Sequence, residues 1–138
     1  MDDAALQKLD REAYISLATF RRSGRAVETP VWFALRDGRL WVFSAGDAGK
    51  VKRLRNGPRI RVAPCTLRGG VTGAWLEGTG RIVDDPAEIE AAYAALRAKY
   101  GWQMRLTDFL SGLSGRREHR AVLALTPNQE RGLRKGTN

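Results

Sequence analysis

The first third of the chain alternates short apolar and β-branched runs with turn signals, and this pattern restricts the fold more than any other feature. Residues 13–20, 26–35 and 40–44 each have the composition or the period-two alternation that is typical of strands. A polar, glycine-containing turn separates the first two runs, and Asp37-Gly38, a strong hairpin signal, separates the second from the third. The pattern predicts an antiparallel β-meander.

Further strands and helices follow in the rest of the chain. The additional strands are expected at residues 59–65, 74–83 and 119–126. Helices are expected at residues 1–12, from Asp47 to the stop at Gly57-Pro58, from Pro86 to Gly101 and at 104–113, and residues 127–138 are expected to form a mobile tail. At 138 residues the chain is one domain. The expected fold is mainly β with a few helices (α+β), a small six-stranded antiparallel barrel.

Several residues inside the expected strands indicate special positions. Pro30 cannot donate to a ladder, so its strand is expected at an edge or a bulge. Gly78 and Gly80 indicate bends or the close approach of another group. Trp41 alternates with core positions and Cys65 is a small apolar residue, so both are expected in the interior.

The balance of residue types excludes several classes of protein. No apolar run approaches the roughly 20 residues of a transmembrane helix, and the acidic, polar N-terminus does not resemble a secretory signal, so a cytoplasmic location is expected. The single cysteine, Cys65, and the single histidine, His119, exclude a disulfide framework and a metal centre built from several such residues. No metal is therefore expected.

The net charge of +9 is concentrated at residues 50–61. This window holds six cations and no acid: Lys50, Lys52, Arg53, Arg55, Arg59 and Arg61. It begins at the expected helix start, where backbone N–H groups and the helix dipole favour an anion. A phosphate site is one interpretation and a solvated helix face is the other. Nucleic-acid binding is disfavoured, because the window contains no Phe, Tyr or Trp that could stack on bases.

Five segments together carry a resemblance to a known family. They are Tyr14-Ile15-Ser16-Leu17-Ala18-Thr19, Thr29-Pro30-Val31-Trp32-Phe33, Leu40-Trp41-Val42-Phe43-Ser44, the basic run from Gly49 to Ile60, and Glu77-Gly78-Thr79-Gly80-Arg81. In this arrangement the chain resembles the flavin- and deazaflavin-binding split β-barrel proteins related to pyridoxamine 5′-phosphate oxidase. Among them it is most similar to the branch that uses the deazaflavin coenzyme F420.

The resemblance implies a function in which the cofactor supplies the chemistry. The protein would be an F420H2-dependent oxidoreductase that passes a hydride from the reduced deazaflavin to an electron-poor small organic substrate. It would form a homodimer with the cofactor in a groove between two barrels. The alternatives are a non-catalytic F420 carrier, an FMN-binding oxidoreductase and a haem-handling relative on the same barrel.

For the phosphate end of the cofactor, the resemblance implies a basic pair, a nearby amide and a hydroxyl at a strand end: Lys50, Lys52, Asn56 and Ser44. Many relatives have Ser or Thr followed by Arg directly before the lysine, whereas this chain has Ala48-Gly49. One contact is therefore missing or is replaced by Arg53 or a distant arginine. Cations in the turn at 21–25 would suit the anionic poly-glutamate tail of F420.

For the ring end, the resemblance implies a strand segment that offers backbone groups to the polar edge of the ring: Thr29, Pro30, Val31 and Trp32. Trp75 and Glu77 would lie where the partner subunit approaches the ring. Tyr14, Tyr93 and Tyr100 are candidate proton donors, although packing is the simpler role for each. No catalytic residue is assigned.

Overall fold

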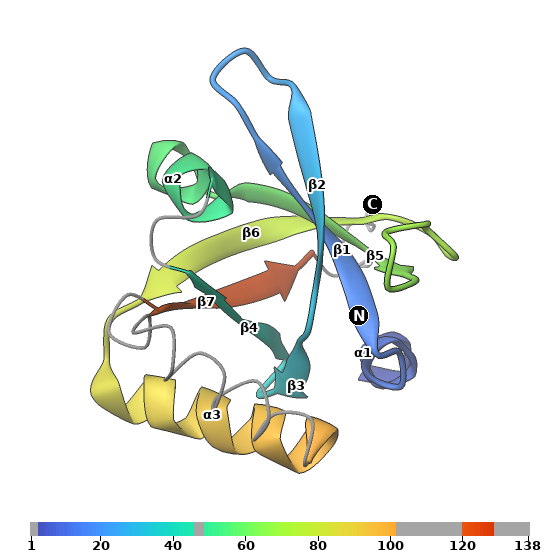
Figure 1. Ribbon diagram of the computed structural model, residues 1–138, viewed down its shortest axis with the longest axis vertical. Helices are drawn as coiled ribbons and strands as arrows, with labels where there is room; N and C mark the ends of the chain where they lie inside the picture. Colours follow the sequence, from blue (N-terminus) through green and yellow to red (C-terminus); the bar gives the residue numbers. More distant parts are fainter. Residues whose placement is uncertain (1–2, 46–48, 102–119, 129–138) are drawn as a thin grey trace.

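The computed structural model describes residues 3–45, 49–101 and 120–128, in which seven antiparallel strands form one sheet flanked by three helices (Figure 1). The strands are β1 (Tyr14–Phe20), β2 (Ala26–Val31), β3 (Ala34–Arg36), β4 (Arg39–Ala45), β5 (Arg59–Cys65), β6 (Leu76–Val83) and β7 (Arg120–Pro127). The helices are α1 (Asp3–Asp10), α2 (Gly49–Asn56) and α3 (Pro86–Tyr100). The predicted class, mainly β with a few helices, is confirmed.

The two edges of the sheet are consecutive in the chain. The strand order is β2-β1-β5-β6-β7-β4-β3, so β2 and β3 lie at opposite ends, yet only Trp32 and Phe33 separate them in sequence. Three Cα–Cα steps span at most about 11 Å. The sheet must therefore curl until its edges come together, and Figure 1 shows β2 continuing directly into β3.

The sequence predicts six strands and the structure has seven, because the run at 26–35 is divided. The backbone leaves the ladder at Phe33, whose N–H donates to the Tyr100 hydroxyl at 3.0 Å. The Phe33 side chain enters the core and is fully buried. The partner that interrupts the strand lies 67 residues away in the sequence, so no local pattern could reveal it.

Alternate strand residues fill the interior of the half-barrel, as the period-two pattern predicts. The main core cluster consists of Leu9, Ile15, Leu17, Val31, Phe33, Leu40, Val42, Val51, Leu54, Ile60, Val62, Leu123 and Leu125. Burial of one such side chain contributes about 1.5–3 kcal/mol. Val51 and Leu54 come from α2, so the apolar face of this helix fixes it against the barrel.

Helix α3 begins and ends as its sequence predicts. The Asp85 side chain accepts from the backbone N–H of Ala87 at 3.3 Å, Pro86 occupies the first turn, and the helix ends before Gly101. Figure 1 shows α3 lying across β3 and β4. Its Ala92 packs in a buried cluster with Trp41, which confirms the interior position expected for this tryptophan.

Gly78 marks a close approach between β6 and β7, which confirms the expectation for this residue. A Cβ there would lie 2.8 Å from the Cα of Pro127 and closer still to the carbonyl oxygen of Thr126. Any side chain would therefore push the two backbones apart.

Four predictions concern residues outside the described ranges: the helix start at Asp47, the helix at 104–113, His119, and the tail from residue 129 onward. The tail predicted from residue 127 is wrong at its start, because Pro127 ends β7 and the N–H of Asn128 donates to the carbonyl of Glu77 at 2.7 Å. Among the described residues, none of the helices is long and apolar enough to cross a membrane.

Candidate functional site

Two cations of α2, Lys50 in its first turn and Arg53 one turn further on, are both half-buried. The Nε of Arg53 donates to the Thr19 hydroxyl oxygen of β1 at 2.6 Å. Thr19 is only 1% exposed, so its position is fixed by the sheet. The bond therefore ties the Arg53 guanidinium to β1 and limits its freedom to move.

Gly49, the first residue of α2, lies directly against this guanidinium. A Cβ on residue 49 would be 2.7 Å from Nη1 of Arg53 and 3.3 Å from its Cζ. The guanidinium thus occupies space that a side chain at position 49 would otherwise fill.

Among the described residues, no acid forms an ion pair with Lys50 or Arg53. Burial lowers the pKa of Lys50, and the nearby charge of Arg53 lowers it further. Burial also lowers the pKa of Arg53, with a smaller contribution from Arg21. The ion pairs in the described part of the chain all involve other cations. Crowded, desolvated cations without acidic partners are a favourable environment for an anion.

The other predicted phosphate residues of α2 are placed differently. Lys52 is exposed, and two residues along a helix it projects roughly 160° away from Lys50. The Asn56 Oδ1 accepts from Nη2 of Arg22 at 3.5 Å. The cation that the structure brings beside Lys50 is therefore Arg53.

The basic turn at residues 21–25 joins this site, although the two are far apart in sequence. Arg22 reaches Asn56 at the end of α2, and Arg21 is close enough to Arg53 to lower its pKa. The β1–β2 hairpin and α2 thus form one continuous basic surface. Sequence reasoning treated these clusters separately, because only the fold brings them together.

Ser44 lies near the end of β4 and is 8% exposed. It pairs in register with Ala121 of β7. Its own strand, β4, is the one that precedes α2 in the chain. Its position at a strand end agrees with the prediction.

Thr29, Pro30 and Val31 lie on β2, which is an edge strand, as expected from the proline. They pair with Leu17, Ser16 and Ile15 of β1. In the described part of the chain no strand pairs with the outer side of β2, so backbone groups on that side are available to a ligand.

Trp32 stacks face to face on Tyr100, with ring centroids 4.4 Å apart and an interplanar angle of 9°. One face of the indole therefore packs on α3, and only the rest of the ring is left for a ligand. The stack fixes the bend between β2 and β3.

Ser16 is a residue that the sequence reasoning did not single out. Its hydroxyl is buried without a hydrogen-bond partner among the described residues, and the residue is 1% exposed. It lies opposite Pro30 in register. The available signal is a serine between two buried aliphatic residues, Ile15 and Leu17, of β1.

Trp75 belongs to an arginine–aromatic layer on the outer face of β5 and β6. The Arg61 guanidinium lies 5.2 Å from the Trp75 ring centroid, and Arg59 lies 4.1 Å from that of Phe20. Glu77 pairs with Arg59 at 3.5 Å and with Arg61 at 3.8 Å. Aromatic rings therefore do contact Arg59 and Arg61, although the rings belong to other segments of the chain. Glu77 offsets part of the positive charge of these two arginines.

Packing contacts are seen for Tyr93, Tyr100 and Cys65. Burial raises the pKa of the Tyr100 hydroxyl, which is bonded to backbone, so it is a poor proton donor. Tyr93 packs edge-on against Phe43 at 4.0 Å. Burial likewise raises the pKa of Cys65.

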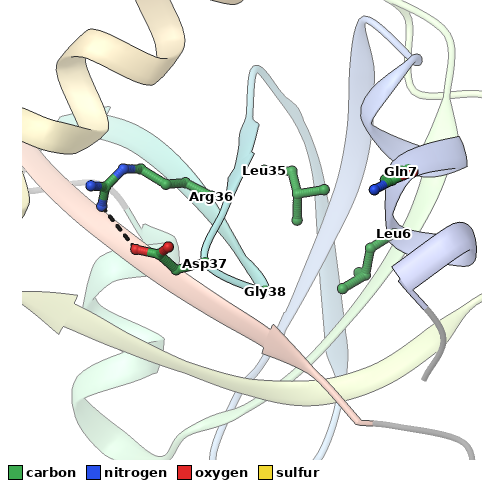
Figure 2. Close-up of a pocket in the computed structure, with 6 residues that line it drawn as sticks. All are labelled: Leu6, Gln7, Leu35, Arg36, Asp37 and Gly38. Carbon is green, nitrogen blue, oxygen red and sulfur yellow. Dashed lines mark hydrogen bonds and ion pairs between the residues drawn. The ribbon is translucent and has the colours of Figure 1, made fainter.

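A separate groove of about 320 Å³ lies between α1 and the β3–β4 turn (Figure 2). Its lining residues are Leu6, Gln7, Leu35, Arg36, Asp37 and Gly38. Arg36 is already paired with Asp37 at 3.0 Å. This groove holds none of the residues predicted to bind a cofactor.

Fold and site together define a small antiparallel half-barrel protein with a basic helix beside its sheet. The model of the pyridoxamine 5′-phosphate oxidase family matches residues 1–134, and the chain belongs to this family. No protein of curated function matches the chain.

Solved structures show the same fold at low sequence identity. A heme storage protein from Vibrio cholerae is 16% identical with a TM-score of 0.68, covering 92% of this chain and 90% of that protein. A FAD-binding protein from Mesorhizobium loti is 16% identical with a TM-score of 0.62, covering 94% and 90%. An F420 reductase is 18% identical with a TM-score of 0.58, covering 89% and 93%.

The residues fit a phosphorylated cofactor at the phosphate end. Lys50 and Arg53 supply the positive charge, and the small Gly49 leaves room for the Arg53 guanidinium beside the start of the helix. The orphan hydroxyl of Ser16, opposite Pro30, is a polar atom whose partner the described chain does not provide.

Proposed function

We propose that this protein is an oxidoreductase that binds coenzyme F420 and transfers a hydride from its reduced form to an electron-poor small organic substrate. The observation that carries the proposal is the half-buried pair Lys50 and Arg53 on a barrel of this family, with which no acid in the described part of the chain forms an ion pair. The fold similarity to an F420 reductase supports the choice of cofactor.

In this proposal the chain binds the cofactor, orients its ring and shields the ring from water. The bound deazaflavin supplies the hydride. Lys50 and Ser44 hold the phosphate end. Lys52, which projects away from Lys50, and Asn56, at the other end of α2, contribute only to the polar surroundings of the site. The free side of β2 at residues 29–32 orients the polar edge of the ring through backbone groups.

The proposal includes a homodimer in which Trp75 and neighbouring residues face the partner. Two large apolar side chains in the described part of the chain, Leu67 and Val71, are 65% and 40% exposed, and both lie in the segment between β5 and Trp75. Burial against a second copy would remove this apolar surface from water. Sedimentation analysis tests this, with Leu67→Asp expected to shift the protein towards monomer.

FMN is the second candidate cofactor, because a flavin phosphate suits the same cations and a FAD-binding protein shares the fold. Titration of the purified protein with F420 and FMN side by side separates them. Tighter binding of F420, followed by oxidation of F420H2 with enones or quinones, supports the proposal.

Matched variants sharpen this experiment. Lys50→Ala should weaken F420 binding, whereas Arg55→Ala, which removes an exposed cation from the same helix, should have a small effect. Exclusive binding of FMN would refute the F420 assignment, and F420 binding without turnover of any acceptor would indicate a carrier.

A further inference from the structure

We propose that Arg53 is a direct ligand of the bound phosphate, and that its guanidinium occupies the space left open because residue 49 is glycine. The inference deepens the proposed function by naming the residue that binds the anion beside Lys50. It rests on that function only for the identity of the molecule that carries the phosphate.

The first step concerns space. Arg53 lies one turn beyond Gly49, and its Nη1 is 2.7 Å from the point where a Cβ on residue 49 would be. A side chain at position 49 and the present position of the guanidinium are therefore mutually exclusive. Glycine permits a cation from the next turn to fold back along the helix towards Lys50.

The second step concerns orientation. Arg53 Nε donates to Thr19 Oγ1 at 2.6 Å, and the burial of Thr19 keeps this acceptor in place. With Nε engaged, the plane of the guanidinium is fixed and its two Nη groups remain for an anion. A planar fork of this kind binds two phosphate oxygens at once.

The third step concerns charge. Arg53 lies near both Lys50 and Arg21, each contact is repulsive, and no acid in the described part of the chain pairs with Arg53. A phosphate group is negatively charged near neutral pH, and its binding offsets this repulsion. The fold thus holds the cations in an arrangement that a bound anion stabilises.

The test measures the binding of inorganic phosphate, FMN and F420 to matched variants by calorimetry. Arg53→Ala should weaken phosphate binding by at least about tenfold, as loss of a charge-assisted contact implies. Arg53→Lys should recover only part of the affinity, because it keeps the charge but loses the fork. Arg55→Ala is the control for loss of one exposed charge.

A swap tests the spatial argument. Gly49→Arg alone should disturb the site, since two guanidinium groups would compete for one space. Gly49→Arg combined with Arg53→Ala should bind phosphate more tightly than Arg53→Ala alone, because the cation returns from the other position. Thermal unfolding of each variant confirms that it is folded.

The outcomes separate this inference from the proposed function. If Arg53→Ala binds phosphate and cofactor no more weakly than Arg55→Ala, the inference is overturned even when F420 binds. If the wild-type protein binds none of the three probes, the inference also falls. If phosphate binding depends on Arg53 but neither F420 nor FMN binds, the inference stands and the proposed function fails.

Discussion

The hydroxyl of Tyr100, at the end of α3, accepts a hydrogen bond from the backbone N–H of Phe33 at 3.0 Å. The same oxygen is 2.8 Å from the carbonyl of Ala13, to which it donates. One side chain therefore satisfies backbone groups at the bend between β2 and β3 and just before β1. Because residues 29–32 lead into this bend, Tyr100 is a positioning residue for the proposed ring site.

Tyr100→Phe should destabilise the protein by about 1–3 kcal/mol, since it leaves the buried N–H of Phe33 without an acceptor. Cofactor affinity should also fall, because the bend loses its support. Urea unfolding and cofactor titration measure the two effects. Tyr14→Phe, at a half-buried tyrosine of β1, is the control and should change stability little.

Asp10 compensates Lys99 beside the same bend. Its Oδ1 accepts from Lys99 Nζ and from the Leu35 N–H, both at 3.1 Å, and Lys99 lies 3.5 Å from the Phe33 ring centroid. Asp10→Asn should cost about 1–3 kcal/mol of unfolding free energy, because it leaves a poorly solvated ammonium without its counter-charge.

The matched double variant of this pair, Asp10→Asn with Lys99→Met, should recover part of that loss, since no unpaired charge remains. Chemical denaturation of the single and double variants provides the comparison. If the Asp10→Asn variant and the double variant are equally stable, the role of Asp10 is not to compensate the charge of Lys99.

The pH dependence of stability should reflect Lys50, whose pKa is lowered below 10.5 in the folded protein by burial and then by Arg53. Between the lowered pKa and 10.5, the unfolded chain binds more protons than the folded one. The contribution of Lys50 to stability therefore rises with pH across this window in the ligand-free protein. Phosphate affinity should fall across the same window, because the ammonium loses its charge.

Comparison with Lys50→Met isolates this contribution from that of Lys99, whose pKa is also lowered by burial. Denaturation at a series of pH values should show a steeper rise for the wild-type protein than for the variant. Parallel profiles would contradict the assignment.

The continuous basic surface of the hairpin and α2 should bind the tail of the cofactor. Full-length F420 should bind more tightly than a tail-shortened form, and the difference should shrink at high salt. Replacing Arg21, Arg22 and Arg25 with alanine should reduce the same difference. Equal affinity of the two forms for the unmodified protein would remove the support for this role.

Gly78→Ala should destabilise the protein by about 2 kcal/mol or more, since the added Cβ would meet the backbone of β7. Gly57→Ala is the matched control, because no atom lies within 4 Å of the Cβ that it would add. Thermal unfolding of both variants shows whether the destabilisation comes from the close packing at Gly78 or from the replacement of any glycine by alanine.

Local patterns predicted the elements that depend on neighbours in sequence. The Asp37-Gly38 hairpin, the Asp85-Pro86 helix start and the edge position of Pro30 are all confirmed. Each depends on backbone preferences that act over a few residues. The pattern could not reveal the division of β2 from β3, because that division depends on Tyr100.

The sequence indicated where in the chain the candidate site lies, but only some of the residues that the structure brings together there. The density of cations identified α2, and Arg53 was already named as a possible replacement contact. The structure adds Thr19 and Ser16, whose roles depend on contacts between elements. A cation that folds back over a glycine, or a hydroxyl left without a partner, has no signature in spacing or composition.

The joint between β2 and β3 has a mechanical consequence. Two residues of chain, rather than a ladder of backbone hydrogen bonds, hold the edges of the sheet together. A separation of these edges would break no strand pairing in the described sheet, and the stack of Trp32 on Tyr100 would oppose it. The proposed ring site at residues 29–32 therefore lies beside the line where side-chain contacts, rather than backbone pairing, close the wall.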